Sequence, residues 1–216
     1  MSATATTPAR REAMPGLKGK GVLVTGGTSG IGQAIAVKFA EYGANVAINY
    51  LRAAEEAADT EQQVNACVNR VQQEGVRDVL VGGDVSQEDQ VVAMVGQAVG
   101  ELGGLDVLIN NAGIQISRHS DERSSDDFDK VLAVNIRGAF LCAREAIKHF
   151  LAEGKPLIIN VSSVHQLIPK PDYLGYSVSK GGMQNLTRAR VRRARNPRQR
   201  DRPGRDRDPD QSRVDR

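Results

Sequence analysis

Short apolar runs alternate with amphipathic stretches from Gly21 to about residue 187. Five of these runs are rich in Val, Ile and Leu: GVLVTG (21–26), NVAINY (45–50), DVLVGGD (78–84), LDVLINNAG (105–113) and PLIINVSS (156–163). Their apolar residues are continuous and do not alternate with polar ones, which is typical of strands buried on both faces of a parallel sheet.

The stretches between these runs have the periodicity of helices. IGQAIAVKFAEYG (31–43) stops at Gly43, and SQEDQVVAMVGQAVGEL (86–102) opens on Ser86 as its expected N-cap. Strand and helix in regular alternation imply right-handed crossovers, so the fold class predicted is α/β, a doubly wound, Rossmann-like parallel sheet. We expect one domain over residues 17–188, preceded by a flexible segment, residues 1–16.

The net charge of the chain combines two different parts. The 216 residues carry a formal charge of +3, but residues 188–216 alone hold 12 Arg and 5 Asp, leaving 17 basic and 21 acidic residues, a net of −4, for residues 1–187. Residues 189–216 have too few apolar side chains to offset the entropy of ordering, so we expect a disordered tail. A nucleic-acid-binding arm would also explain the Arg, but interleaved Asp and the lack of aromatic residues argue against it.

Several broad classes of protein are excluded by composition. No run of about 18 apolar residues offers a membrane span, and the N-terminus lacks the apolar core of a secretory signal. Cys67 and Cys142 are too few for a disulfide framework and favour a reducing, cytoplasmic setting in which neither is reactive. The three His show no metal-ligand spacing, so we expect no metal.

The first candidate site is the glycine-rich segment TGGTSGIG (25–32), between the first strand and the first helix. Glycine lets the backbone turn tightly and approach a pyrophosphate, whose charge is met by the N–H groups of the helix N-terminus. A simple glycine-rich turn is the alternative. The position after the first buried strand favours nucleotide binding by Gly26, Thr28, Ser29, Gly30, Ile31 and Gly32.

The end of the second strand bears on the choice of nucleotide. A ribose 2′-hydroxyl is usually held there by Asp or Glu, and a 2′-phosphate by Arg. Here Tyr50 and Arg52 stand at this end and the carboxylate is absent. The pattern favours NADP, or mixed use of NADP and NAD, unless Arg52 is an ordinary surface residue.

Two further strand ends carry polar or small residues. Asp84 and Val85 follow the third strand, and Asn111, Ala112 and Gly113 follow the fourth. Taken alone each is an ordinary turn signal. Together, at the edge of the sheet where ligands bind, their side chains can hydrogen-bond neighbouring loops and line a cleft.

A set of acid–base residues follows the fifth strand. Ser163 ends this strand, and Tyr176 and Lys180 stand at i and i+4, on one face of a predicted helix. A free phenol has a pKa of about 10, and a nearby cation would lower it toward the range of a general base. Ser163 could then donate a hydrogen bond to the substrate oxygen. A surface Tyr and Lys is the alternative, which a nucleotide site at the same edge disfavours.

Together TGGTSGIG, NNAG, Asn135 in VNIRG, Ser163 and YSVSK (176–180) resemble the short-chain dehydrogenase/reductase family, over residues 15 to about 188. The resemblance implies Tyr176 as proton acceptor, Lys180 as the group that lowers its pKa and holds the nicotinamide ribose, and Asn135 as the anchor of a proton-relay water. It also implies that Asp84 meets the adenine and that the protein is a homotetramer.

The residues around Ser163 carry a narrower resemblance. SSVHQ (162–166), YSVSKGGM and AREAIKHF (143–150) are similar to glucose 1-dehydrogenases, which implies oxidation of a sugar or similar secondary alcohol. Those enzymes carry Glu where this chain has Gln166, so the substrate stays open. We expect His165 to shape the substrate pocket.

Beyond residue 188 the resemblance stops abruptly. Codons permitted for residues 190–216, read one base later, give EYAARGIRVNAIGPGATVTPINRAWI, which resembles the continuation of the family with its GIRVN strand and GPG turn. The sequence therefore favours a frameshifted, truncated C-terminus that lacks the last strands. Such a chain would have low stability and little turnover, and a catalytically inactive NAD(P)-binding remnant is the alternative function.

Overall fold

The computed structural model describes residues 14, 16–51, 57–72, 74–153 and 157–188. Arg52 lies outside the described residues, as do nearly all of the expected flexible segment 1–16 and the whole tail 189–216. The predictions that fall on them therefore stay predictions.

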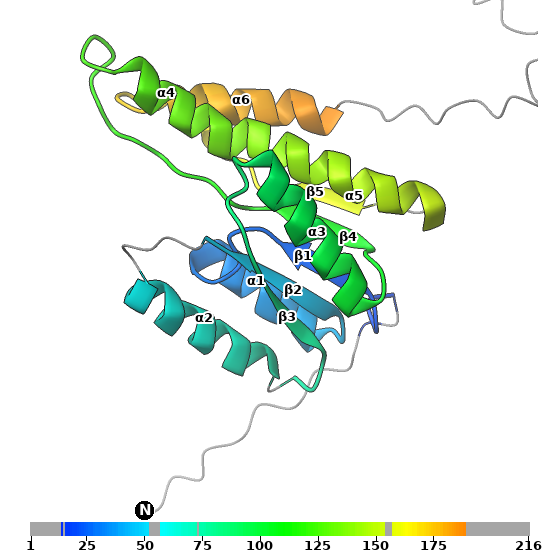
Figure 1. Ribbon diagram of the computed structural model, residues 1–216. Helices are drawn as coiled ribbons and strands as arrows, with labels where there is room; N and C mark the ends of the chain where they lie inside the picture. The colour runs from blue at the N-terminus through cyan, green and yellow to red at the C-terminus, as the bar shows by residue number, and fades with distance from the viewer. Residues whose placement is uncertain (1–13, 15, 52–56, 73, 154–156, 189–216) are drawn as a thin grey trace, which may run out of the picture.

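Five parallel strands form one sheet, in the order β3-β2-β1-β4-β5 (Figure 1). Their bounds are Gly21–Val24 (β1), Asn45–Tyr50 (β2), Asp78–Gly82 (β3), Val107–Asn110 (β4) and Leu157–Asn160 (β5). Every neighbouring pair is parallel. The chain winds outward from β1 in one direction through β3 and then in the other through β5, so the predicted doubly wound α/β sheet is confirmed. Its topological switch point lies between β1 and β4, where such sheets bind ligands.

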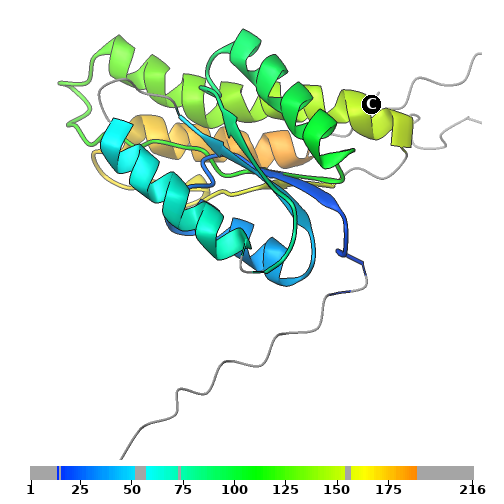
Figure 2. The same ribbon diagram turned by 60° about the horizontal axis from the view of Figure 1, so that its bottom comes forward.

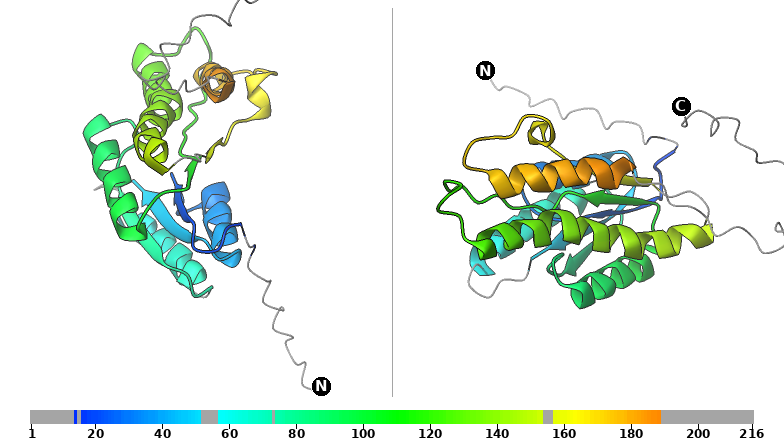
Figure 3. Two further views of the ribbon diagram at one scale, coloured as in Figure 1. Left: turned by 90° about the vertical axis from the view of Figure 1, so that its right-hand side faces the viewer. Right: turned by 90° about the horizontal axis from the view of Figure 1, so that it is seen from above.

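Helices cover both faces of the sheet (Figure 3). They are α1 (Gly30–Glu41), α2 (Ala57–Gln72), α3 (Glu88–Leu102), α4 (Ser125–Leu132), α5 (Ala139–Glu153) and α6 (Leu174–Arg188). A π-helical turn, Ala133–Gly138, joins α4 to α5, so that the two run nearly in line beside α6 (Figure 2). No helix in the described ranges is long and apolar enough to cross a membrane.

Alternating strand side chains divide the core into two layers. Leu23 and Leu108 pack with α3 and α5 in one cluster, whereas Val22, Val24 and Ile109 pack with α1 and α2 in the other. This is the reason for the continuous apolar runs, since a strand buried on both faces has no position left for a solvated side chain.

The predicted N-cap at Ser86 is wrong. Helix α3 begins at Glu88 with Gln87 as its N-cap. The Ser86 N–H donates to Asp84 Oδ1 at 2.8 Å, and the Gln87 N–H donates to the Asp84 carbonyl at 3.0 Å. A local turn held by the Asp84 carboxylate therefore uses the residues that sequence periodicity assigned to the helix.

Strand β5 has β4 as its neighbour on one side and no described strand on the other. Leu157 and Ile159 are 48% and 40% exposed, whereas Ile158, which points to the opposite face, packs against the α3–α5 cluster. One apolar face of this strand is thus open within the described part of the chain, so the prediction that all five strands are buried on both faces is wrong for β5.

Candidate active site

The glycine-rich loop turns sharply between β1 and α1. Gly26 has a φ of 58° and Gly30 a φ of 51°, a region that side chains disfavour. A Cβ on Gly32 would lie 2.1 Å from the Gly26 carbonyl oxygen and 2.4 Å from Asn111 Nδ2, so only glycine fits there. The first turn of α1 therefore packs directly on the loop.

The N-terminus of α1 is open to an anion. The N-cap residue Ser29 makes no side-chain hydrogen bond to the helix, and the first turn contains no acidic residue. Ile31 is 65% exposed beside it, and nothing lies within 4 Å of the position of a Cβ on Gly30. Unpaired N–H groups at a helix terminus fit a pyrophosphate, and the cradle of glycines leaves room for it.

Thr25 and Asn111 tie the loop to β4. The Asn111 and Ala112 N–H groups both donate to Thr25 Oγ1 at 3.0 Å. Asn111 Nδ2 donates to the carbonyl oxygens of Thr25 and Gly26, both at 2.9 Å. The two strand ends at the switch point are therefore held in a fixed relation. Gly113 follows them, and a Cβ added to it would lie 3.3 Å from Asn135 Oδ1.

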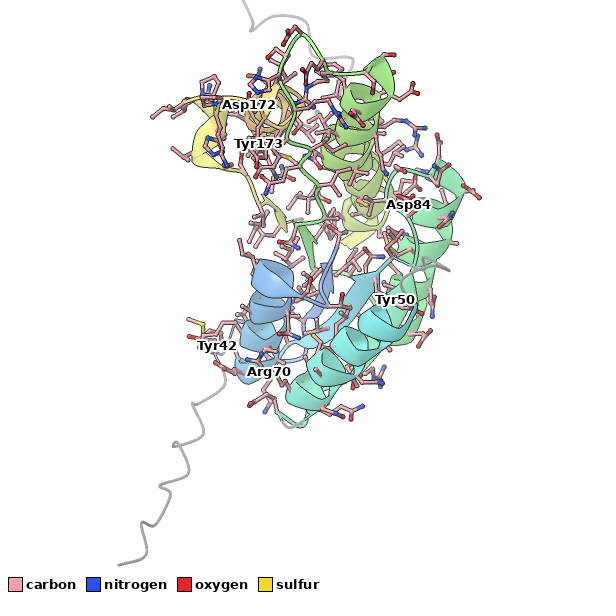
Figure 4. All side chains as sticks on the ribbon, turned by 90° about the vertical axis from the view of Figure 1, so that its left-hand side faces the viewer. Tyr42, Tyr50, Arg70, Asp84, Asp172 and Tyr173 are labelled. Atoms are coloured by element: carbon pink, nitrogen blue, oxygen red, sulfur yellow. The ribbon has the colours of Figure 1, made fainter. Side chains whose placement is uncertain are left out.

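The ends of β2 and β3 form the adjoining part of this edge. Tyr50 pairs with Gly82, and Figure 4 shows Tyr50 and Asp84 on the same side of the molecule. The Asp84 carboxylate is engaged by the Ser86 N–H, and Val85 is buried against Gly138 of the π-helical turn. The residues predicted from the second and third strand ends, except for Arg52, therefore lie at the same edge of the sheet as the glycine loop, on its β3 side.

Asn135 is fully buried in the π-helical turn and uses its whole side-chain amide within the protein. Its Oδ1 accepts the Ile114 N–H at 2.7 Å, and its Nδ2 donates to the Ile114 carbonyl at 2.8 Å and to Ser179 Oγ at 3.0 Å. Ser179 in turn donates to the Tyr176 carbonyl at 2.7 Å. Asn135 thus links the segment after β4 to α6, and π-helical turns of this kind often occur at functional sites.

Tyr176 and Lys180 lie on one face of α6, one turn apart. Lys180 is only 4% exposed; its Nζ donates to the Val161 carbonyl at 2.8 Å and lies 5.5 Å from the centroid of the Tyr176 ring. Burial lowers the pKa of Lys180, because a desolvated ammonium is costly. An ordinary surface pair would leave the ammonium in water. A buried amine next to a half-buried phenol therefore favours an acid–base role over the surface alternative.

Ser163 and His165 approach the same tyrosine from the end of β5. Ser163 caps the short 3-10 turn Val164–Gln166, and its Oγ accepts the His165 N–H at 3.2 Å. The His165 ring lies edge-on to Tyr176 with centroids 6.1 Å apart. The structure therefore places His165 between Ser163, which its N–H contacts, and the Tyr176 ring, which Lys180 approaches along α6.

Gln166 and the two cysteines are occupied or unreactive. Ser162 Oγ donates to Gln166 Oε1 at 2.8 Å, so Gln166 has a partner within the same turn. Burial raises the pKa of the Cys67 thiol, and that of Cys142 to about 12. Among the described residues, no group of three or more His, Cys, Asp or Glu is placed to hold a metal ion.

Three buried polar residues at this edge escaped sequence reasoning: Thr25, Asn49 and Ser179, which are 1%, 2% and 1% exposed. Thr25 and Ser179 fall inside motifs without standing out, and Asn49 sits inside an apolar run. The signal that could have found Asn49 is that one amide interrupts a strand predicted to be buried on both faces, where a polar group needs partners.

Known proteins are similar to this chain in sequence and in fold. A family model for short chain dehydrogenases matches residues 20–196. Glucose 1-dehydrogenase of Gluconobacter oxydans (strain 621H) is 45% identical over 171 residues, which cover 79% of this chain and 62% of that protein. A 3beta-hydroxysteroid dehydrogenase of Eggerthella lenta is 40% identical, over 80% of this chain and 64% of its own length.

A solved structure agrees with the sequence comparisons. A dehydrogenase/reductase from Sinorhizobium meliloti 1021 superposes with a TM-score of 0.68 at 37% identity, covering 78% of this chain and 64% of that chain. The chain thus spans less than two thirds of the length of these relatives. The matched part contains the glycine loop, Asn135 and the Tyr176–Lys180 pair, and on this evidence the chain belongs to the short-chain dehydrogenase family.

Proposed function

We propose that this site transfers hydride between NAD(P) and a secondary alcohol of a sugar or a similar small molecule. The observation that carries the proposal is the buried Lys180 ammonium beside the Tyr176 ring, at the edge of the sheet where the glycine loop opens. An open helix N-terminus for a pyrophosphate and a phenol with its own cation at one edge suit this class of reaction.

The residues of the chain divide the work as follows. Gly26, Gly30 and Gly32 let a dinucleotide approach the α1 N-terminus, and the bound oxidised nicotinamide would supply the hydride acceptor. Tyr176, as phenolate, takes the proton of the substrate hydroxyl, and Lys180 stabilises that phenolate. Ser163 donates a hydrogen bond to the reacting oxygen, which orients the alcohol and stabilises the negative charge that develops there.

Asn135 holds these groups in place. Its amide is fully engaged by Ile114 and Ser179, and Ser179 contacts the Tyr176 backbone. The side chain therefore contributes by fixing α6 relative to the segment after β4, in addition to the proposed role of Asn135 as the anchor of a proton-relay water.

We further propose NADP as the preferred nucleotide, with NAD as a weaker alternative. Strand β2 ends on Asn49 and Tyr50 and offers no carboxylate for a ribose 2′-hydroxyl, and Arg52 follows two residues later.

A second candidate is a nucleotide-binding chain without turnover. The exposed Leu157 and Ile159 favour it, because an open apolar strand face lowers stability and promotes association. Both candidates retain the nucleotide half of the fold, so they differ in catalysis and not in binding.

One pair of measurements separates these possibilities. The 216-residue chain is titrated with NADPH and with NADH by fluorescence, and glucose-dependent reduction of NADP is then followed by absorbance. Binding with turnover supports the dehydrogenase, and binding alone supports the inactive chain. Retention on nucleic acid that is lost with salt, without nucleotide binding, would support the basic-tail alternative.

Two tyrosine variants test the assigned base. Tyr176→Phe keeps the ring and its contact with Lys180, so it should retain nucleotide affinity and lose turnover. Tyr173→Phe is the matched control, because Tyr173 lies in the loop before α6 with Lys170 Nζ 3.9 Å from its ring centroid (Figure 4). Turnover that survives in Tyr176→Phe, or that is lost equally in both variants, contradicts the assignment.

A further inference from the structure

We propose that Asn49 is a positioning residue that fixes two loops of the nucleotide site relative to each other: the glycine loop (25–32), proposed to hold the pyrophosphate, and the loop after β3 (83–87), proposed to meet the adenine. The proposal rests on the proposed nucleotide binding. It names a residue that would act by holding the two loops and not by contacting the nucleotide. It follows from the hydrogen bonds that this one buried amide makes with both loops.

The Asn49 side chain is completely satisfied at the carboxyl end of β2. Its Oδ1 accepts the Gly26 N–H at 3.1 Å. Its Nδ2 faces three carbonyl oxygens, those of Gly83 at 3.0 Å, Val81 at 3.1 Å and Tyr50 at 3.3 Å. One acceptor and one NH₂ group in this orientation are what only an amide supplies. A carboxylate here would keep the bond to Gly26 and set negative charge against three carbonyls.

On one side, Asn49 determines where the glycine loop lies. Its side chain accepts the Gly26 N–H, and its backbone carbonyl accepts the Gly27 N–H at 2.9 Å. Asn111 holds the Gly26 carbonyl from the other side. That same carbonyl packs against Gly32, so any shift of Gly26 is passed to the first turn of α1, which is the proposed pyrophosphate site.

On the other side, Asn49 determines where the loop after β3 lies. Gly83 is held through its carbonyl by Asn49 and through its N–H by the Tyr50 carbonyl at 3.0 Å. Asp84, the predicted adenine contact, is the next residue. Asn49 thus joins the pyrophosphate loop and the adenine loop through a single rigid group.

This rigidity matters for binding because a ligand that spans two loops gains affinity when both are already in place. Loss of the Asn49 amide should leave the loops free to separate, and each binding event would then have to order them. We expect weaker nucleotide affinity, with a kcat at saturating nucleotide that changes little.

The test uses Asn49→Asp and Asn49→Ala in the 216-residue chain, with two controls. Asn45→Asp changes the same residue type at the opposite end of β2, where Oδ1 accepts the Arg77 N–H and a carboxylate can still do so. Val79→Ala opens a cavity near the start of the neighbouring strand, where Val79 pairs with Ala47, and lowers stability without removing a hydrogen bond of Asn49. Dissociation constants for NADPH are measured below the unfolding temperature of every variant.

We expect the dissociation constant to rise about tenfold or more in both Asn49 variants, equivalent to about 1.4 kcal/mol, and to change less than about twofold in the controls. Equal losses in Val79→Ala would overturn the proposal, since stability alone would then explain them. Unchanged affinity in Asn49→Ala would overturn it as well.

Amide hydrogen exchange gives a second readout that does not depend on nucleotide. In Asn49→Ala the Gly26 amide, which loses its side-chain acceptor, should exchange at least about tenfold faster, whereas the Gly27 amide keeps the Asn49 backbone carbonyl. If the wild-type chain binds no nucleotide, the proposed function fails, and this exchange pattern still decides whether Asn49 holds the loop. Equal exchange rates at Gly26 in the variant and in the wild type would show that it does not.

Discussion

Replacement of Gly32 by alanine tests the close packing between α1 and the glycine loop. The new Cβ would lie 2.1 Å from the Gly26 carbonyl oxygen and 2.4 Å from Asn111 Nδ2. Ordinary contact begins near 3.4 Å, so the helix or the loop must move by roughly 1 Å. Ala36 and Ala40 of α1 are buried against the sheet, so the helix has little freedom to retreat.

The magnitude follows from three effects. Overpacking of this kind costs about 1–3 kcal/mol, and displacing the Asn111–Gly26 hydrogen bond adds about 1 kcal/mol. Alanine is a better helix former than glycine by about 1 kcal/mol, which offsets part of the loss. We expect a net destabilisation of about 2 kcal/mol, and a Tm lower by about 4–8 °C for a domain of this size.

Thermal unfolding followed by circular dichroism measures this change, with Gly96→Ala as the control. Gly96 is an exposed residue inside α3, and nothing lies within 4 Å of where its Cβ would be. The same substitution should therefore stabilise the protein there by about 0.5–1 kcal/mol. An increase in Tm in both variants would refute the packing argument, because helix propensity alone would then account for the results.

Three further variants and one labelling experiment probe other parts of the structure. Phe150→Ala, which empties a buried position in the α3–α5 cluster, should cost about 3–5 kcal/mol in chemical denaturation. The pKa of about 12 predicts that a thiol reagent at pH 8 leaves Cys142 unmodified until the chain unfolds. Labelling of the folded chain at the rate of an exposed thiol would contradict the burial. Lys180→Met should raise stability while abolishing turnover. Burial lowers the pKa of Lys180 in the folded state, so wild-type stability rises with pH from that lowered pKa up to about 10.4, and the advantage of the variant should disappear above that pH. A chain whose residues 190–216 are replaced by the alternative-frame sequence should be more soluble and unfold more cooperatively, as light scattering and denaturation would show; equal behaviour of the two chains would contradict the frameshift interpretation.

The fold was predictable because its signals are local and repeated. Each buried strand needs a continuous apolar run, and each run was visible along the sequence. The order of strands and helices then leaves few topologies for a parallel sheet. The one helix boundary that failed, at Ser86, failed because a side-chain bond from Asp84 competes with the helix for the same backbone groups.

The candidate site was predictable where chemistry is tied to spacing. Tyr176 and Lys180 are one helical turn apart, and glycines after the first strand mark a tight loop. The sequence could not give the burial of Lys180, because this depends on α6 packing over the end of β5. It also could not give the hydrogen-bond partners of the Asn135 side chain, because Ile114 and Ser179 are 21 and 44 residues away.

Sequence by itself therefore determined the class of fold, the edge where a ligand is expected to bind and the residue types proposed to act there, because periodicity and motif spacing are properties of neighbouring residues. Only the tertiary structure decided which polar groups are held and which are free to act. Asn49 illustrates the difference: in the sequence it is one amide in an apolar strand, and in the structure its four hydrogen bonds join two loops that are far apart along the chain. Hydrogen-bond satisfaction of a buried group depends on atoms brought together by folding, and no local pattern specifies them.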